Sequence, residues 1–354
     1  MKTICKKLAL ILAVLLTFAL VSCGNNKTEY ADSVFTAMDT VITLRLAAND
    51  VDNAALGSAA ASVKELTAKL EGILSCHDDT SELAALNRDI HLQIETDETL
   101  LAVLDTAFTI SELTGGTYDP TIGALTELWN VGGGGPVPKE REIVEALTHK
   151  GIDKLILEGT TITKNDTSLK LDLGGIGKGY ALQQILACLS ATDVPYGLVS
   201  MGGNIGVFGQ KPDSTPYQIG VKDPHDTSTI VGYLYIPSGF VSVSGNYERF
   251  FREDGKLYHH ILDPETGWPA DSGLSSVAVY TQNGASADAL STALFVMGLE
   301  ESMAFYESGK MQFEAVFITE DSRIHLTPGL VESGMFEMTT EDYILDENSI
   351  PAEE

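Results

Sequence analysis

The chain has 354 residues, of which 44% are apolar and 33 are glycine. This length and apolar content predict a globular protein with one large domain or about two smaller ones. Its 22 basic residues face 50 acidic ones, a formal net charge of −28. Binding to nucleic acid depends on clustered Lys and Arg, so this charge argues against nucleic acid as a partner and fits an exported protein better.

The N-terminus has the pattern of an export signal. Lysines at positions 2, 6 and 7 precede an uncharged run, residues 8–21, which is too short to span a bilayer comfortably and has the length of a signal h-region. Residues 20–23, LVSC, resemble a lipobox, in which Cys23 becomes the lipidated first residue of the mature chain. We therefore expect a lipoprotein signal peptide over 1–22 and a lipid-anchored tether over 23–33. The protein is expected at the cell membrane, facing outward. An ordinary secretory signal or a buried apolar helix is the alternative.

The cysteines agree with this interpretation. Cys5 leaves with the signal and Cys23 takes the lipid, so only Cys76 and Cys188 remain. Two cysteines are too few for a disulfide framework or a zinc cluster. Two buried free thiols are expected, although the sequence leaves their pairing open.

The first half of the mature chain alternates strands, helices and glycine-rich turns. A β-branched, alternating pattern predicts a strand over Val34–Ala47, and apolar residues at helical spacing predict helices over Asp52–Leu74 and Asp97–Leu113. The second helix should stop at Gly115-Gly116. Four glycines at 132–135 indicate a loop. A short helix (139–149), three short strands of an antiparallel meander (153–172) and a helix from about Gly179 to Leu189 follow.

The second half is mainly strands. Seven short strand patterns separated by Gly, Pro and Asp turns run from Tyr196 to residue 280, and a helix over Ala285–Met297 interrupts them. Two more strands follow, and the acidic tail, 341–354, is expected to fray. Because most strands are joined by turns rather than by helices, we predict an α+β fold with mixed or antiparallel sheets and flanking helices.

Residues 171–181, LDLGGIGKGYA, form the most unusual turn. Walker A requires Ser or Thr where Gly179 stands, and GxGxxG requires glycine where Tyr180 stands, so neither phosphate-loop pattern applies. Bare backbone N–H groups at a helix start beside Lys178 nevertheless suit a diphosphate. A plain tight turn explains the glycines equally well.

Four segments carry further candidates. Asp288 and Thr292 are four residues apart on the predicted helix, so both face one side and could bind Mg²⁺, although spacing alone favours a cap or dipole partner. His259 and His260 lie in a predicted strand and face opposite sides, so at most one enters a site. Glu248 and Arg249 alone indicate a surface ion pair. Tyr118 and Asp119 suit either a helix start or a stacking plate for a flat ring.

Taken together, the motifs resemble the ApbE family of FAD:protein FMN transferases, from about Val34 to Thr340. The matching segments are, in order, MDT (38–40), the SxxxxxSELxxLN pattern (75–87), GGTYDPT (115–121), DLGGIGKGYA (172–181), MGGNI (201–205), SGNYER (244–249), HHILDPETG (259–267) and ADALSTALFVMG (287–298). The family pattern has glycine where Asp39 stands, alanine where Gly177 stands and an aromatic residue where Cys76 stands.

The resemblance implies a magnesium-dependent enzyme over residues 34–340, with two interleaved subdomains and an active site in the cleft between them. Such an enzyme cleaves FAD, attaches FMN through a phosphoester bond to a threonine of an acceptor protein, and releases AMP. The implied acceptors are a subunit of the Rnf or Na⁺-pumping quinone reductase type or an extracellular flavoprotein. A magnesium-dependent FAD pyrophosphatase and a non-catalytic flavin-binding lipoprotein remain as alternatives.

The resemblance also implies roles for single residues. Asp288, Thr292 and the carbonyl of Gly177 would hold the magnesium ion, with Asp288 counted as catalytic, and His260 would handle the proton. Lys178 and the glycines around it would lie beside the diphosphate. The FAD-binding set then comprises Met38, Tyr118, Asp119, Asp172, Gly175, Lys178, Glu248, His260 and Ile261.

Overall fold

A computed structural model describes residues 30–76, 78–89, 91, 93–346 and 348. The expected signal peptide, Cys23 and most of the expected tether therefore lie outside the described residues, as do residues 347 and 349–354 of the acidic tail. Across the described ranges, no helix combines the length and the apolarity needed to cross a membrane.

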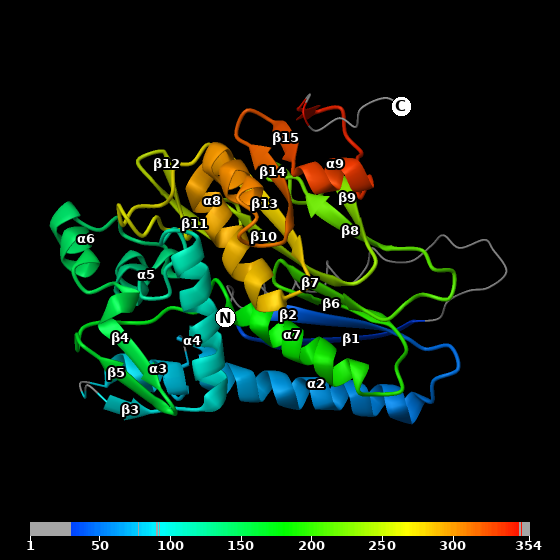
Figure 1. Ribbon diagram of the computed structural model, residues 1–354, viewed down its shortest axis with the longest axis horizontal. Coiled ribbons are helices and arrows are strands. Elements are labelled where there is room, and N and C mark those ends of the chain that lie inside the picture. Colours follow the sequence, from blue (N-terminus) through cyan, green and yellow to red (C-terminus); the bar gives the residue numbers. More distant parts are fainter. Residues whose placement is uncertain (1–29, 77, 90, 92, 347, 349–354) are drawn as a thin grey trace, which may run out of the picture.

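A nine-stranded sheet forms the centre of the molecule (Figure 1). Each neighbouring pair in it is antiparallel except the last, β15 with β17, which is parallel. This confirms the predicted α+β class with a mostly antiparallel sheet. In spatial order the strands are β1 (Tyr30–Ala37), β2 (Thr40–Ala47), β6 (Gly197–Met201), β7 (Asn204–Phe208), β10 (Gly239–Gly245), β13 (Leu274–Thr281), β14 (Glu314–Thr319), β15 (Arg323–Leu326) and β17 (Ile344–Leu345).

The single strand expected over Val34–Ala47 is wrong, because the chain turns back at Met38-Asp39 and makes the hairpin β1–β2. Both turn residues have left-handed backbone angles, with φ of 50° and 56°. Strand-like alternation continues on both sides of the turn, so the pattern does not reveal it. Aspartate is among the few residues that tolerate this conformation. The first strand also begins at Tyr30, before the expected start of the domain.

Three long helices cover one face of the sheet. They are α2 (Asn53–Leu74), α7 (Gly177–Ser190) and α8 (Gly284–Glu307), and α7 packs between the other two. Figure 1 shows α2 and α7 running side by side along β1 and β2. The predicted helices are confirmed, but α8 continues past Met297 after a break at Gly298, whose φ of 77° and ψ of 178° are not helical.

A second region lies beside α4 (Glu98–Leu113), which packs on α8. It contains α3 (Glu82–Arg88), α5 (Gly123–Trp129), α6 (Glu140–Leu147), the 3₁₀ turns η2 (Val131–Gly133) and η3 (Ile152–Lys154), and a small sheet in the order β3 (Gln93–Glu95), β5 (Thr161–Lys164), β4 (Leu155–Glu158). The predicted three-stranded meander is therefore wrong in its third strand. Segment 169–172 makes only an isolated bridge through Lys170, and β3 comes from earlier in the chain.

The remaining elements lie toward the C-terminus. They are a third sheet in the order β16 (Phe336–Met338), β9 (Ile230–Ile236), β8 (Tyr217–Lys222), the hairpin β11 (Phe250–Glu253) with β12 (Lys256–His259), and the helix α9 (Pro328–Ser333). The described part of the acidic tail does not fray. Tyr343 is only 4% exposed and its hydroxyl donates to Asp223 Oδ1 at 2.6 Å, which places Ile344–Leu345 beside β15.

One apolar core joins the two regions. It includes Leu83 from α3, Leu104 from α4 and Ile162 from β5, together with Leu294 from α8 and Phe317 from β14. Residues far apart in the sequence thus share one interior, which holds the start of α8 at the boundary between the regions.

Candidate active site

Asp288, in the second turn of α8, is the most buried carboxylate of the predicted site, at 5% exposure. Its Oδ2 accepts a hydrogen bond from the Gly179 N–H at 2.8 Å. Its Oδ1 accepts from Asn204 Nδ2 at 3.2 Å and from Ser242 Oγ at 3.3 Å. All three donors are neutral, so they satisfy the oxygens without offsetting the negative charge, and a buried charge of this kind favours a cationic ligand.

Two glycines bring the start of α7 against the start of α8. A Cβ at Gly179 would lie 2.6 Å from the Asp288 Cβ and still closer to the Gly284 carbonyl oxygen. A Cβ at Gly284 would lie 2.5 Å from the Gly179 carbonyl oxygen. Only glycine permits this approach, and the approach lets the Gly179 N–H reach the carboxylate.

A cluster of hydroxyl groups supports the same carboxylate. Ser242 and Ser244 alternate along β10, so both side chains reach one face, where Ser291 meets them at oxygen–oxygen distances of 3.3 and 2.8 Å. Ser244 Oγ is also 3.3 Å from Thr292 Oγ1. Sequence reasoning missed these serines and Asn204. The available signal was the pair of polar residues two apart in the otherwise apolar segment FVSVSG.

The glycine-rich turn is closed by its own polar groups. Lys178 Nζ donates to the Gly174 carbonyl at 2.8 Å, and Asp172 Oδ1 accepts from the Gly174 N–H at 2.6 Å. Helix α7 begins at Gly177, two residues before its predicted start. The expectation of bare N–H groups here is wrong for most of the turn, because the Ile176 and Gly177 N–H groups both donate to the Leu173 carbonyl. The N–H group near the start of this fourteen-residue helix that reaches Asp288 is that of Gly179.

Helix α3 anchors this turn through Asn87, which sequence reasoning left without a role. Asn87 Nδ2 donates to the Leu171 carbonyl and its Oδ1 accepts from the Leu171 N–H, both at 2.8 Å. Leu171 directly precedes Asp172, so α3 fixes the chain where it enters the glycine turn.

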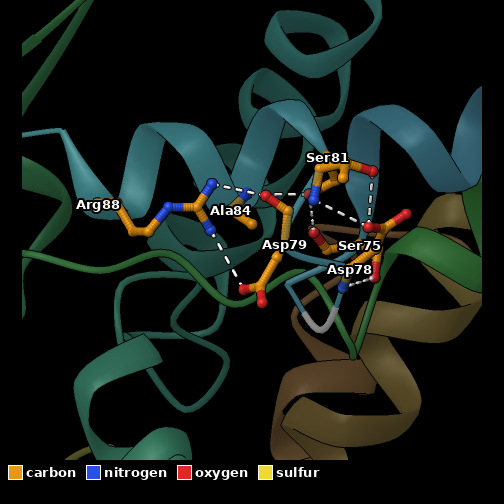
Figure 2. Close-up of polar contacts among 7 residues, drawn as sticks. Ser75, Asp78, Asp79, Ser81, Ala84 and Arg88 are labelled. Carbon is orange, nitrogen blue, oxygen red and sulfur yellow. Dashed lines mark hydrogen bonds and ion pairs between the residues drawn. The ribbon is translucent and has the colours of Figure 1, made fainter.

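The turn before α3 is itself held by short-range hydrogen bonds (Figure 2). Ser75 Oγ accepts from the Asp78 N–H at 3.0 Å, and the Ser81 hydroxyl donates to the Ser75 carbonyl while accepting from the Ala84 N–H at 3.0 Å. Arg88 reaches back to the Asp79 carbonyl at 2.6 Å. The serines of the SxxxxxSEL pattern are therefore the residues that close the turn and cap α3.

Cys76 lies within this turn, close to other candidate residues. Burial first, and then the charges of Asp172 and Asp39, raise the pKa of its thiol to about 12. The hairpin tip and the glycine turn therefore both lie within electrostatic range of Cys76. Cys76 and Cys188 are free, as expected, but they are half-buried rather than buried.

Charged side chains from other segments surround this buried centre. Desolvation raises the pKa of the Glu248 carboxyl, and the charge of Asp288 adds to the rise while Lys178 and Lys222 oppose it. Glu248 is nevertheless exposed to solvent. The surface ion pair expected between Glu248 and Arg249 does not occur among the described contacts.

The two histidines differ in burial and in hydrogen bonding. His259, 6% exposed, lies edge-on to Phe295, and its Nε2–H donates to the Ala270 carbonyl at 3.0 Å while its Nδ1 accepts from the Ile261 N–H at 3.3 Å. Both ring nitrogens are thus engaged within the fold. The strand β12 ends at His259, so His260 lies just beyond the strand predicted for it.

His260 has one ring nitrogen available for chemistry. Its Nδ1 lies 3.2 Å from the Arg249 carbonyl oxygen, which only accepts hydrogen bonds, so Nδ1 carries the proton and Nε2 keeps a lone pair. Desolvation, followed by the charge of Lys178, lowers the pKa of this imidazole to about 3. His260 is therefore neutral at physiological pH in the free protein.

Tyr118 and Asp119 enter from the turn before α5. Tyr118 is 4% exposed, and burial together with the charges of Asp172 and Asp288 raises its pKa well above the usual value. The Asp119 carboxylate accepts from the Thr121 N–H at 2.8 Å and lies 3.7 Å from Lys150 Nζ. Asp119 therefore stabilises its own turn, and it does not cap α5, which begins at Gly123.

The last two predicted residues lie at the edges of this group. The Met38 N–H, at the hairpin tip, donates to Glu71 Oε1 at 2.7 Å. Beside it is a hollow of about 400 Å³, lined by Thr36, Ala37, Asp39, Thr40, Val41 and Glu71. Ile261 is 4% exposed, and its carbonyl accepts from the Ala270 N–H at 3.0 Å.

Comparison with known proteins gives one consistent result. The ApbE family model matches residues 38–317. The FAD:protein FMN transferase of Treponema pallidum is 35% identical over 74% of this chain and 77% of its own length, and that of Vibrio cholerae is 30% identical over 73% and 79%.

Solved structures agree. The crystal structure of the ApbE protein from Thermotoga maritima superimposes with a TM-score of 0.79 at 33% identity, over 85% of this chain and 98% of that one. The flavin transferase ApbE from Vibrio cholerae gives 0.75 at 26% identity, with the same two shares. With the family model spanning most of the chain and these relatives matching in both sequence and fold, the protein belongs to the ApbE family.

Proposed function

We propose that the protein is a FAD:protein FMN transferase, which cleaves the diphosphate of FAD, attaches FMN to a threonine of an acceptor protein and releases AMP. Family membership supports this activity. The observation in this chain that carries it is the buried Asp288 carboxylate, whose described donors are all neutral and include the Gly179 N–H near the start of α7. A buried negative charge beside a helix start suits a cation and a diphosphate bound together.

The residues present fit Mg²⁺. Magnesium in phosphate-transferring enzymes is held by one or two carboxylates plus substrate phosphates, and it does not need a cage built only from protein. Accordingly, no group of three or more His, Cys, Asp or Glu residues that could hold a metal occurs in the described ranges. Asp288, the Thr292 hydroxyl and the Gly177 carbonyl would hold the ion. When bound, it supplies neutralisation of the charge that develops on the phosphoryl oxygens.

Lys178 and the start of α7 bind the diphosphate. Lys178 Nζ donates to the Gly174 carbonyl, so the ammonium group lies over the glycine turn with donors left for a phosphate oxygen. Met38, Tyr118, Asp119, Asp172, Gly175, Glu248 and Ile261 form the rest of the FAD-binding set. Because the Asp119 carboxylate already binds Thr121, Asp119 acts mainly by shaping the turn that carries Tyr118.

His260 takes the proton from the acceptor threonine. Its Nε2 has a lone pair because Nδ1 donates to the Arg249 carbonyl, so the neutral imidazole is in the tautomer that can accept this proton. The threonine oxygen forms a bond to the phosphorus of the FMN half, and the bond from that phosphorus to the bridging oxygen breaks. The bridging oxygen leaves with AMP, and the threonine proton moves to Nε2.

The cellular setting is part of the proposal. The lipobox at residues 20–23 and the acidic composition support a mature protein anchored to the outer side of the cell membrane through Cys23. Its acceptor is then an outward-facing flavoprotein, either a membrane redox subunit of the Rnf or Na⁺-pumping quinone reductase type or an extracellular flavoprotein.

One experiment tests the activity. The mature protein is incubated with FAD, MgCl₂ and a candidate acceptor domain, and intact-mass and peptide spectra are searched for FMN on one threonine while AMP is quantified. Modified acceptor and stoichiometric AMP are expected, and replacing the modified threonine with alanine should abolish labelling. AMP and free FMN with an unmodified acceptor would indicate a pyrophosphatase instead. FAD binding without AMP would indicate a flavin-binding lipoprotein.

A further inference from the structure

The Tyr118 hydroxyl is a buried polar group without a hydrogen-bond partner in the described part of the chain. The side chain is 96% buried, and burial keeps its pKa well above the usual value, so the hydroxyl is neutral and retains its proton. A buried donor left unpaired destabilises a folded protein, and such groups are uncommon. An unpaired hydroxyl beside a proposed site therefore indicates a ligand atom that would accept its hydrogen bond.

The Tyr118 ring lies beside residues of the proposed diphosphate and cation site. A Cβ built on Gly175 would lie 3.2 Å from both Tyr118 Cε2 and Thr292 Oγ1, so the tyrosine and the threonine face the same space over the glycine turn. Asp172 and Asp288 lie close enough to affect the tyrosine pKa. The hydroxyl thus lies beside the diphosphate and cation residues of the proposed function.

The turn that carries Tyr118 is rigidly held. The Asp119 carboxylate accepts from the Thr121 N–H, and the Thr121 hydroxyl accepts from the Gly151 N–H at 2.7 Å. The Asp172 N–H donates to the Pro120 carbonyl at 2.8 Å, which ties the tyrosine turn to the glycine turn. The hydroxyl is therefore fixed before any ligand arrives, which lowers the entropic cost of using it.

We propose that the Tyr118 hydroxyl donates a hydrogen bond to a non-bridging oxygen of the FAD diphosphate. This inference rests on the proposed function and deepens it, since it makes Tyr118 a recognition residue for the diphosphate as well as a wall of the pocket. The donor is uncharged, so it adds to Lys178 without adding a second cation beside the metal site. A hydrogen bond to a charged acceptor is stronger than one between neutral groups.

The test compares Tyr118→Phe with a matched control, Tyr196→Phe. Tyr196 is 3% exposed, and its hydroxyl also lacks a partner among the described residues, but it lies near Ala47, at the end of the β1–β2 hairpin away from Met38. Each change removes one orphan hydroxyl and keeps the ring. Affinities are measured for ADP with MgCl₂, for FAD with EDTA to prevent turnover, and for riboflavin, which has no phosphate.

Tyr118→Phe should weaken ADP and FAD binding roughly tenfold to a hundredfold, the range of one hydrogen bond to a charged group. Riboflavin affinity should not change, and the ligand-free thermal unfolding temperature should stay the same or rise, because an unsatisfied buried hydroxyl is gone. Tyr196→Phe should leave all three affinities unchanged.

Two results would overturn the assignment. Unchanged ADP and FAD affinities in Tyr118→Phe would mean that the hydroxyl meets only water. An equal loss of riboflavin affinity would mean that it acts at the flavin ring. Failure of the proposed function looks different: wild-type protein that binds ADP but neither binds nor cleaves FAD contradicts flavin transfer, while a selective ADP loss in Tyr118→Phe still supports a diphosphate donor. Wild-type protein that binds none of these diphosphates overturns both.

Discussion

The two sides of the candidate site are built differently. Asp288 and its serine and asparagine donors come from regular helices and strands and are buried. Glu248 and His260 come from segments between strands and remain at least partly accessible, with Lys178 at a helix start. The buried side suits a group that must be held in one place, a metal with its diphosphate. The accessible side suits proton transfer to and from an acceptor as large as a protein.

Removing the charge of the buried side should have the largest effect. Asp288→Asn keeps the size of the side chain but loses the charge that would hold the cation, so the rate of AMP release from FAD should fall roughly 10²- to 10³-fold or more. The exposed Asp105 on α4 provides the control, because Asp105→Asn should leave the rate unchanged. Retention of the rate in Asp288→Asn would move the cation site elsewhere.

The accessible side is tested by the two histidines. His260→Gln should lower the rate of FMN transfer roughly 10²-fold, because the general base is lost. His259→Gln should instead lower the free energy of unfolding by about 1–3 kcal/mol, because His259 is bonded at both ring nitrogens. Rates and unfolding curves of both variants are compared. An equal loss of rate in His259→Gln and His260→Gln would contradict a structural role for His259 and a catalytic role for His260.

The contact between α7 and α8 links the two sides and is tested by Gly179→Ala. The added methyl group meets the backbone of Gly284 and the Asp288 Cβ, so the helices must separate, at a cost of about 1–3 kcal/mol. Gly57 is the matched control. It lies in α2 with no atom near its missing Cβ, so Gly57→Ala should stabilise the protein by about 0.5–1 kcal/mol. Urea unfolding measures both, and an undiminished stability of Gly179→Ala would show that the contact is loose.

The pH dependence of stability is expected to change only gradually, by a small amount for each step in pH. His260 has a pKa of about 3 in the folded protein against an ordinary value of 6.5, so below pH 6.5 the unfolded chain binds a proton that the folded chain does not. The free energy of unfolding should therefore decrease as pH falls from about 6.5 toward 4, by up to about 1.4 kcal/mol per pH unit. His260→Gln should reduce the dependence of the free energy of unfolding on pH. An unchanged dependence would mean that the His260 imidazole is more solvated than the structure shows.

Local pattern predicted most of the long elements but not how they pair. Helices α2 and α4 begin one residue after their predicted starts, Asp52 and Asp97, because apolar periodicity is a local signal. The hairpin turn at Met38-Asp39 was not predicted, because the alternating strand pattern continues on both sides of the turn. Strand β3 was not predicted because its partner β5 is far along the chain, and the docking of Tyr343 on Asp223 joins residues 120 positions apart.

By itself, the sequence determined the helices, most of the strands, the glycine turn and the ordered motifs that identify the family, since all of these depend on residues close together in the chain. Only the tertiary structure decided what surrounds each candidate side chain. Asp288 accepts hydrogen bonds from Gly179, 109 residues away, and from Asn204, 84 residues away. The tautomer of His260 is determined by the Arg249 carbonyl, eleven residues away. Burial and hydrogen-bond partners arise when distant segments pack. The burial of the Asp288 carboxylate, the available ring nitrogen of His260 and the unpaired hydroxyl of Tyr118 therefore appear only in the folded chain.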